Sequence, residues 1–383
     1  MLNSPYGGKL VNREEFGKKE RYIEEARESP VIFPYIDFFY DSFKISDGSY
    51  SPLEGFMDRN TLETVLNETR LPSGLPWSIP VILAVKSDEI RGVKEGDRVI
   101  LGAHDRNPFG FIDIDEIYKV EKEKIASKIY GTTDPVHPNV EDLELRYGDT
   151  ALGGKVTIFE RLPMPGGSYE LSPAETRARF ESLGWKNVVA YQARNPPHVA
   201  HEYLQKVSLE VPGIDGLFIH LVVGKLKKGD YKASVILDSY RALIDNYHRR
   251  ERVLMGALSI TMRYAGPKAA LFLATIRRNY GATHYIIGRD QAGVGNFYGP
   301  YDAHKMFDEF NIGITPLKYT DTFYCRKCQG ITSEKVCPHD KSSRIMISQT
   351  KIREMLTKGE PIPGEIIRKE VAEILSKGNV IAD

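Results

Sequence analysis

The sequence is poor in cysteine, has no excess of charge of either sign and contains no long apolar run. Its three cysteines all lie between Cys325 and Cys337, too few and too clustered for a framework of disulfides. Lysine and arginine together number 52, as do aspartate and glutamate, so the basic surplus of a nucleic-acid-coating protein is missing. No stretch approaches the roughly 18 apolar residues that a membrane span needs. We therefore expect a globular protein of the reducing cytoplasm, with neither membrane nor nucleic acid as partner.

The length of the chain indicates more than one domain. At about 150 residues per domain, 383 residues make two or three. Apolar, β-branched stretches at 77–85, 93–102 and 107–120 are separated by turn residues, which predicts a β-rich first domain. A segment rich in Pro, Gly and Asp at 130–143 is expected to be a loop, followed by a domain boundary near 150–170.

From about residue 170 the pattern changes to an alternation of strands and helices. Apolar strands are expected at 187–192, 214–224, 253–260, 283–288 and 313–319, and helices at 171–184, 198–211, 232–248, 267–281 and 303–310. Ser172 is the expected cap of the first helix, with Pro173 at its first position. Such alternation predicts a parallel, doubly wound α/β sheet. Two further helices are expected in the tail, at 347–359 after the cap Ser348 and at 363–378.

A cluster of polar residues follows the first strand of the predicted parallel sheet. The cluster contains, in order, Gln192, Arg194, Asn195, Pro196, Pro197, His198 and His201. The i, i+3 spacing places both imidazoles on one helix face, at a helix N-terminus whose free N–H groups attract anions. A guanidinium fork beside them suits sulfate or phosphate, and parallel sheets bind ligands at the carboxyl ends of their strands. We interpret the segment as an anion site; the alternative is an ordinary strand–turn–helix with structural histidines.

Three further segments fall at expected strand ends or helix starts. The strand at 283–288 leads into Arg289, Asp290, Gly293 and Gly295, where glycine lets the backbone approach a ligand. The helix start at 347–354 carries Ser348, Thr350, Lys351 and Arg353, and the strand at 214–224 leads into Lys225, Lys227, Lys228 and Asp230. Each could contact a phosphate chain. Plain helix capping and a solvated lysine loop are the alternatives for the last two.

The cysteines and a nearby histidine have the spacing of a metal site. Cys325 and Cys328 are separated by two residues, and Cys337 and His339 could complete the set. Thiolate-rich tetrahedral sites prefer zinc, and four protein ligands leave no open position, so we predict a structural zinc ion. The identity of the fourth ligand stays open, because a single residue between Cys337 and His339 is a tight spacing.

These motifs together resemble one enzyme family. QARNPPHVAH resembles the QxRNPxHxxH signature of ATP sulfurylases (sulfate adenylyltransferases), GRDQAGVG resembles their GRDHAGxG loop, and ISQTKIRE their ISGTKxR segment. SPYGGKLV, SPLEGFM and YGTTDPVHP are also similar to segments of the family. The similarity runs through essentially the whole chain, with the segments in the same order as in the family. The set of Cys325, Cys328, Cys337 and His339 resembles the zinc-binding insert of some prokaryotic members.

The resemblance implies a fold and a reaction. It implies a PUA-like β domain over 1–165, a nucleotidyltransferase α/β domain of the HxGH type over 166–320, and a small closing domain over 321–383. The implied reaction joins ATP and sulfate into adenylyl sulfate (APS) and diphosphate, with Mg²⁺, in a cytoplasmic homodimer. No P-loop kinase segment is recognised, so we expect a stand-alone enzyme. Its place would be in sulfur metabolism: either APS formation for sulfate assimilation or respiration, or the reverse direction, which forms ATP.

The resemblance also implies roles for individual residues. Arg194 and Ala292 would lie at sulfate, Gln192 and Asn195 at the phosphate–sulfate region, and His198 and His201 at the phosphates. The nucleotide loop would consist of Gly288, Arg289, Asp290 and Gln291. Three positions depart from the family pattern: Ala193 stands for Thr, Gln291 for His, and Gln349 for Gly. None of these removes the Arg–Asn or His–His groups, so activity is still expected.

The chemistry that these residues can supply fits the implied reaction. Sulfate is already deprotonated, so no general base is needed, and holding two anions together with their charge neutralised is the main task. Two other functions are compatible with parts of the sequence. One is the same fold acting on another oxyanion or a phosphorylated acceptor. The other is an RNA-binding protein that would use the PUA-like domain and the cysteine–histidine set. The neutral net charge and the lack of an aromatic–basic stripe argue against RNA binding.

Overall fold

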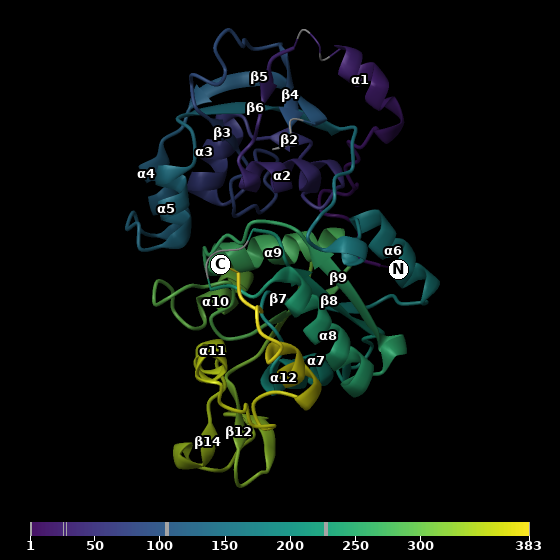
Figure 1. Cartoon of the computed structure of the whole chain (residues 1–383), viewed down its shortest axis with the longest axis vertical. Helices are drawn as coiled ribbons and strands as arrows, with labels where there is room; N and C mark the ends of the chain where they lie inside the picture. Colours follow the sequence, from purple (N-terminus) through teal and green to yellow (C-terminus); the bar gives the residue numbers. More distant parts are fainter. Residues whose placement is uncertain (1, 26, 28, 104–106, 226–228, 383) are drawn as a thin grey trace.

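The computed structural model describes residues 2–25, 27, 29–103, 107–225 and 229–382, so Lys227 and Lys228 lie outside the described residues. Three parts follow one another along the long axis of the molecule (Figure 1). The N-terminal sheet lies at one end, a parallel sheet with its helices in the middle, and a small sheet with α11 at the other end. Within the described ranges no helix is long and apolar enough to cross a bilayer.

The first part is a six-stranded sheet that is antiparallel except at one edge. Its strand order is β1-β4-β5-β6-β2, with β3 also paired to β6, and only β1 and β4 are parallel. The strands are β1 (Val31–Ile32), β2 (Gly55–Phe56), β3 (Leu83–Val85), β4 (Arg98–Gly102), β5 (Pro108–Lys119) and β6 (Thr150–Ile158). The helices around them are α1 (Lys19–Glu25), α2 (Ile36–Ser46), α3 (Arg59–Glu68) and α4 (Lys122–Ile125). The predicted β-rich domain is confirmed, although only the last three residues of the expected strand at 77–85 form a strand.

The expected loop at 130–143 is partly helical, which corrects the prediction. Helix α5 runs over Pro138–Leu145. It has Pro138 at its first position, and the His137 side chain caps it by accepting a hydrogen bond from the N–H of Asn139 at 3.3 Å. Pro135 and Pro138 made the segment resemble a loop, but proline is also well suited to the first turn of a helix.

The second part is a five-stranded sheet whose strands are all parallel. Its order is β11-β10-β7-β8-β9. The strands are β7 (Val188–Ala193), β8 (Gly216–Val222), β9 (Val253–Leu258), β10 (His284–Ile287) and β11 (Thr315–Lys318). The chain builds the sheet outward from β7 to β9, then returns to β7 and continues with β10 and β11 on its other side. The strand order therefore reverses between β7 and β10, where a doubly wound sheet forms its ligand crevice.

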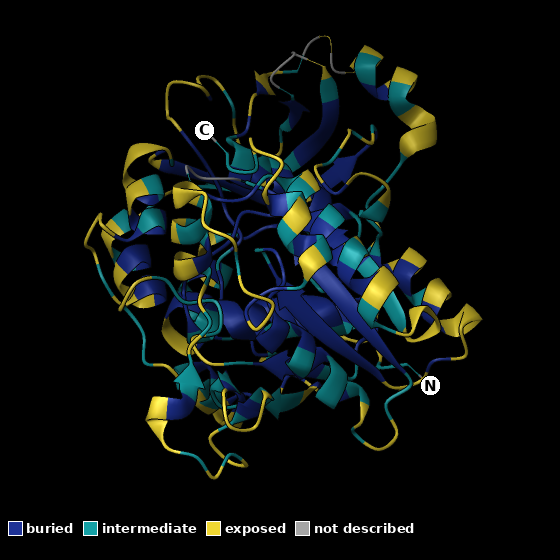
Figure 2. Cartoon of the chain, turned by 60° about the horizontal axis from the view of Figure 1, so that its bottom comes forward, coloured by how far each residue is buried: buried dark blue, intermediate teal, exposed yellow. Residues whose placement is uncertain are grey.

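Helices cover both faces of the parallel sheet, as predicted. They are α6 (Pro173–Ser182), α7 (Val199–Leu209), α8 (Ala233–Tyr247), α9 (Pro267–Asn279) and α10 (Asp302–Glu309). Every residue of β7 and β8 is buried, and the interior of the molecule is dark blue in Figure 2. Helix α9 lies between the sheet and the N-terminal part (Figure 1). Its Phe272 contacts the rings of Tyr50 and Trp77, with centroids 5.1 and 5.5 Å apart, so the two parts share one apolar core.

The helix ends follow the expected capping chemistry. Ser172 caps α6 in a capping box: its hydroxyl accepts from the N–H of Glu175 at 3.2 Å, and the Glu175 carboxylate accepts from the N–H of Ser172 at 2.7 Å. Helix α11 (Gln349–Lys358) begins after Ser348 and ends at Gly359 with φ 67°. Both predictions are confirmed, because such caps satisfy free helix-end groups locally.

The last helix is shorter than predicted. Helix α12 covers Lys369–Leu375, whereas a helix over 363–378 was expected. Ile366 and Ile367 are buried, and the carbonyl of Ile366 accepts from the N–H of Val199 at the start of α7 at 3.0 Å. Packing against α7 therefore determines the backbone of this segment. The third part also contains a small antiparallel sheet of β12 (Thr322–Cys325), β13 (Gly330–Ser333) and β14 (Arg344–Ile345).

Candidate active site

A cavity of about 400 Å³ lies at the carboxyl ends of β7 and β10, where the strand order reverses. All ten residues expected to bind substrate or act in catalysis line it. They are Gln192, Arg194, Asn195, His198, His201, Gly288, Arg289, Asp290, Gln291 and Ala292. Ser348 and Gln349 of the tail line it as well. Segments that are almost 100 residues apart in sequence thus face one space, because parallel strands end at the same edge of a sheet.

His198 and His201 form a stacked, uncharged pair at the start of α7. The Nδ1 atom of His198 accepts from the N–H of His201 at 3.3 Å and so caps the helix. The two rings stack with centroids 3.6 Å apart and an interplanar angle of 22°. Burial lowers the pKa of His198 well below its usual range and lowers the pKa of His201 to about 4. At neutral pH both imidazoles are therefore uncharged and can donate one N–H each to an anion.

Arg194 lies in the cavity between a carboxylate and an aromatic ring. Its Nη1 atom is 3.2 Å from Oδ1 of Asp230, which belongs to the loop after β8. Its guanidinium carbon lies 4.7 Å from the centre of the Tyr264 ring. Lys225 of the same loop turns away from the cavity toward the N-terminal part, where it pairs with Asp142 and, at 3.3 Å, with Asp37. The predicted lysine cluster therefore does not contribute Lys225 to the site, whereas Asp230 pairs with Arg194, which lines it.

The loop after β10 is joined to the end of strand β7 by a pair of side-chain amides, one of them from Gln192 within β7. The side chain of Gln291 donates to Oε1 of Gln192 at 2.9 Å and to the hydroxyl of Tyr285 at 3.4 Å. Gln291 stands where the family usually has histidine, and in this chain it connects the two motifs directly. An uncharged amide in that place contributes no titration near neutral pH.

The same loop contains two non-glycine residues in the left-handed region. Asp290 has φ 52° and Ala292 has φ 60°. Such conformations cost on the order of 1 kcal/mol or more and persist where neighbours enforce them. Here the N–H of Asp290 donates to the carbonyl of Pro300 at 2.7 Å, and the carbonyl of Ala292 accepts from the N–H of Gly266 at 3.2 Å. Arg289 is held by Asp321 at 3.4 Å, so the loop enters the site with a fixed shape.

Helix α11 donates hydrogen bonds to the segment that follows β7. Gln349 donates to the carbonyl of Pro196 at 2.8 Å, and Nη2 of Arg353 donates to Oδ1 of Asn195 at 2.9 Å. Thr350 and Lys351 are exposed and do not line the cavity. Of the predicted third segment, Arg353 therefore acts on the site through Asn195, and Ser348 and Gln349 form part of its wall.

Several residues near the site carried no recognisable signal in the sequence. Two of them belong to the loop between β9 and α9: Met262 forms part of the cavity wall, and the ring of Tyr264 lies against Arg194. This loop is held by Asn139 of the N-terminal part, whose side chain accepts from the N–H of Tyr264 at 2.9 Å and donates to the carbonyl of Met262 at 3.2 Å. His137 adds a contact of 3.0 Å to the carbonyl of Tyr264. More than 120 residues separate Asn139 from these partners, so only the tertiary structure reveals the arrangement.

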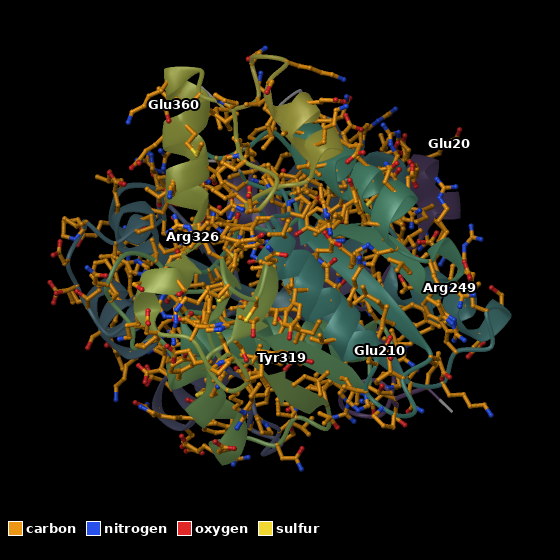
Figure 3. All side chains as sticks on the ribbon, turned by 90° about the horizontal axis from the view of Figure 1, so that it is seen from below. Glu20, Glu210, Arg249, Tyr319, Arg326 and Glu360 are labelled. Atoms are coloured by element: carbon orange, nitrogen blue, oxygen red, sulfur yellow. The ribbon has the colours of Figure 1, made fainter. Side chains whose placement is uncertain are left out.

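The predicted metal ligands come together in the small sheet. The ligand atoms of Cys325, Cys328, Cys337 and His339 lie within 4.8 Å of one another. The sulfurs of Cys328 and Cys337 are 3.8 Å apart, and Nδ1 of His339 is 3.3 Å from Cys328 Sγ and 3.4 Å from Cys325 Sγ. Tetrahedral zinc requires about 3.8 Å between two sulfurs and about 3.6 Å between sulfur and nitrogen. Figure 3 views the molecule from this end and labels Arg326, between the first two cysteines.

The fold and the site define an α/β protein of the nucleotidyltransferase type, and comparisons with known proteins narrow the class. Residues 167–378 match the ATP-sulfurylase family model, and residues 3–161 match that of a PUA-like domain. The chain belongs to the ATP-sulfurylase family. The resemblance seen in the motifs is thereby confirmed.

Relatives and a solved structure agree with this assignment. A sulfate adenylyltransferase of Hyperthermus butylicus is 45% identical over 98% of this chain and 96% of its own length. Those of Symbiobacterium thermophilum and Pyrococcus abyssi are 44% and 42% identical, each over 98% of this chain and over 96% and 98% of their own lengths. A hexameric APS kinase from Thiobacillus denitrificans has a TM-score of 0.79 at 23% identity, covering 99% of this chain and 69% of that one, which shows a shared fold.

Proposed function

We propose that the chain is a sulfate adenylyltransferase, which converts ATP and sulfate into APS and diphosphate. The observation that carries the proposal is the single cavity at the strand-order reversal, lined by both motif loops. Its lining combines a guanidinium, amides and two uncharged imidazoles, which are donors suited to two neighbouring anions. The relatives that bear this name match nearly the whole chain.

The reaction needs positioning more than acid–base chemistry. An oxygen of sulfate attacks the α-phosphorus of ATP, the bond from that phosphorus to the bridging oxygen breaks, and diphosphate leaves. Sulfate carries no proton to remove, so the uncharged His198 and His201 act as donors rather than as a base. Proximity and charge neutralisation then supply the rate enhancement.

The residue roles follow the two loops. In this proposal Arg194 and Ala292 hold sulfate, and Gln192 and Asn195 lie between sulfate and the α-phosphate. His198 and His201 donate to the phosphates. The nucleotide is held by the loop of Gly288, Arg289, Asp290 and Gln291. Arg353 supports Asn195 through its hydrogen bond of 2.9 Å.

The cavity fits a magnesium ion that arrives with ATP. Among the described lining residues only Asp290 and Asp321 carry carboxylates, and Asp321 is paired with Arg289. Magnesium is commonly held by one or two carboxylates together with substrate phosphates rather than by a protein cage. When bound, the ion would neutralise charge on the phosphates, and Asp290 is the available protein ligand.

The cysteine cluster fits a structural zinc ion. The sulfur–sulfur and sulfur–nitrogen separations are close to those of a tetrahedral site, which supports His339 Nδ1 as the fourth ligand. With four protein ligands the ion has no open position, so its role would be to stabilise the small sheet.

We further propose the domain limits 1–165, 166–320 and 321–383. The matches to two families meet between 161 and 167, which supports the first limit, and β11 ends at Lys318 before β12 begins at Thr322, which supports the second. A homodimer is the proposed assembly, testable by light scattering, and the cytoplasm is the proposed location, consistent with three unpaired cysteines.

Exchange of labelled diphosphate into ATP tests the proposal. We expect exchange that depends on sulfate, because the reverse reaction needs APS formed at the site. Diphosphate release is measured in parallel with sulfate, molybdate and organic phosphates as acceptors. Release driven by an organic phosphate and not by sulfate would favour the same fold with a different acceptor and overturn the proposal.

Arg194→Ala tests the central residue of the site. We expect a loss of at least about a hundredfold in kcat/KM, the scale of removing one preorganised charged donor. Arg241→Ala is the matched control, because Arg241 pairs with Asp238 on the exposed face of α8. Near-normal turnover of Arg194→Ala would exclude the proposed role of Arg194.

A further inference from the structure

We propose that Asp230 is a positioning residue for Arg194: it fixes the plane of the guanidinium and thereby sets the affinity of the site for a tetrahedral oxyanion. The inference rests on the proposed function, and it assigns a role to a residue that lies in none of the three motifs of the family. Asp230 belongs to the loop between β8 and α8, 36 residues from Arg194 in sequence. The assignment depends on three features of the structure.

The first feature is the geometry around the guanidinium. Nη1 is 3.2 Å from Oδ1 of Asp230, and the Tyr264 ring lies 4.7 Å from the guanidinium carbon. A guanidinium is planar and carries five N–H donors in a fixed fork. The carboxylate engages one edge and the ring one face, so the plane is defined. Within the described residues the structure records no other hydrogen bond from this guanidinium, which leaves the remaining donors for a ligand in the cavity.

The second feature is the partial burial of the ion pair. The side chain of Arg194 is 25% exposed and that of Asp230 is 10% exposed. Ion pairs at this depth are screened less by water and salt than pairs on the surface, and they hold their geometry better. The chain has a matched pair for comparison: Asp238 and Arg241, at 2.9 Å, are 48% and 57% exposed on α8.

The third feature is the rigid attachment of Asp230 itself. The carbonyl of Asp230 accepts from the N–H of Ala382 at 2.8 Å, and the N–H of Lys232 donates to the carbonyl of Val380 at 3.0 Å. Tyr231 and Ile381 form an antiparallel bridge between these bonds. The C-terminal segment thus holds the backbone on which the carboxylate is carried. A residue that orients a ligand-binding group needs such support to act.

Asp230 has two possible effects, and the attachments favour one. As a competitor, its carboxylate would occupy a guanidinium edge that the anion needs, and its removal would tighten binding. As a positioning residue, it would keep the long Arg194 side chain in one rotamer, and its removal would weaken binding. Because Asp230 and Tyr264 restrain different parts of the guanidinium and Asp230 is itself fixed, the structure supports positioning.

The experiment measures sulfate-dependent diphosphate release by Asp230→Ala, Asp230→Asn and the control Asp238→Ala. For Asp230→Ala we expect the KM for sulfate to rise about tenfold, the effect of losing one charge-assisted hydrogen bond, while the KM for ATP stays within about twofold. Asp230→Asn keeps an oxygen that accepts from Arg194, so an intermediate rise is expected. Asp238→Ala should resemble the wild type.

A double-mutant cycle decides whether Asp230 acts through Arg194. In the Arg194→Ala background, assayed at high enzyme concentration, Asp230→Ala should change the sulfate KM by less than about twofold. Independent, multiplying effects would overturn the proposal, and so would an unchanged or tighter sulfate KM, or equal changes in the KM of both substrates. Melting temperatures are measured for all variants; Asp230→Asn, which keeps the size of the side chain, decides the matter where Asp230→Ala does not fold.

The controls separate this inference from the proposed function. A wild-type protein without sulfate-dependent release would contradict the proposed function itself. An active wild type whose sulfate KM is unaffected by the Asp230 substitutions would contradict only the positioning role.

Discussion

Replacing Asn139 with alanine removes two of the side-chain hydrogen bonds by which the N-terminal part of the chain holds the wall of the active site. Asn139 is buried at the start of α5. Its oxygen accepts from the N–H of Tyr264 at 2.9 Å, and its amide donates to the carbonyl of Met262 at 3.2 Å. Met262 lines the cavity, and the Tyr264 ring lies against Arg194. One amide therefore connects the PUA-like domain to the proposed sulfate site.

The expected magnitude follows from the two backbone groups left behind. Met262 and Tyr264 are 5% and 6% exposed, so water reaches their backbone poorly. An unsatisfied buried group costs about 1–3 kcal/mol, so we expect the free energy of unfolding to fall by about 2–6 kcal/mol. Displacement of Tyr264 would also shift Arg194, and because small misplacements cost much in rate, we expect kcat/KM to fall at least about tenfold.

Urea unfolding and sulfate-dependent diphosphate release measure the two effects. Tryptophan fluorescence is a suitable probe, since Trp77 lies in the N-terminal part and Trp185 in the catalytic part, both buried. Asn67→Ala is the matched control: its amide donates to Glu63 on the exposed surface of α3 at 3.2 Å, and its loss should change stability by less than about 0.5 kcal/mol. Unchanged stability and kinetics in Asn139→Ala, or equal losses in Asn67→Ala, would refute the reasoning.

Two further predictions concern the metal site and the histidine pair. Purified protein should contain one zinc ion per chain, and Cys328→Ser should lose most of it and melt at a lower temperature, because metal binding stabilises the fold; metal analysis that finds no zinc would exclude the site. Burial lowers the pKa of His201 from 6.5 to about 4, so the unfolded chain binds the proton more readily, and this contribution to stability is present above pH 6.5 and lost as the pH falls toward 4. In His201→Asn the decline of stability below pH 6.5 should be shallower by up to about 1.4 kcal/mol per pH unit, and parallel pH profiles of variant and wild type would contradict the assignment.

Local interactions made several features predictable from the sequence. The N-terminus of α6 depends on Ser172, Pro173 and Glu175, and α11 is limited by Ser348 and Gly359. In each case the groups that satisfy a helix end lie within a few residues of it. The alternation of buried strands and helices likewise predicted the parallel sheet, because apolar strands need cover on both faces. Since parallel strands end at one edge, the meeting of the two motif loops followed from the order of the elements.

Other features depended on contacts between distant parts of the chain. The start of α12 is decided by the packing of Ile366 and Ile367, which overrides the helical pattern of 363–368. Asp230 belongs to a basic loop for which the sequence left a phosphate contact and a solvated loop open; in the structure its carboxylate pairs with Arg194, and the C-terminal segment holds its backbone. Asn139 falls in a segment that was expected to be a loop, yet it satisfies backbone groups of the loop between β9 and α9. The sequence by itself thus determined most of the elements, several of their caps and the two motif loops, because these depend on neighbours along the chain. The tertiary structure decided which side chains orient those loops, because a buried polar group takes whatever partner packing brings within hydrogen-bond distance.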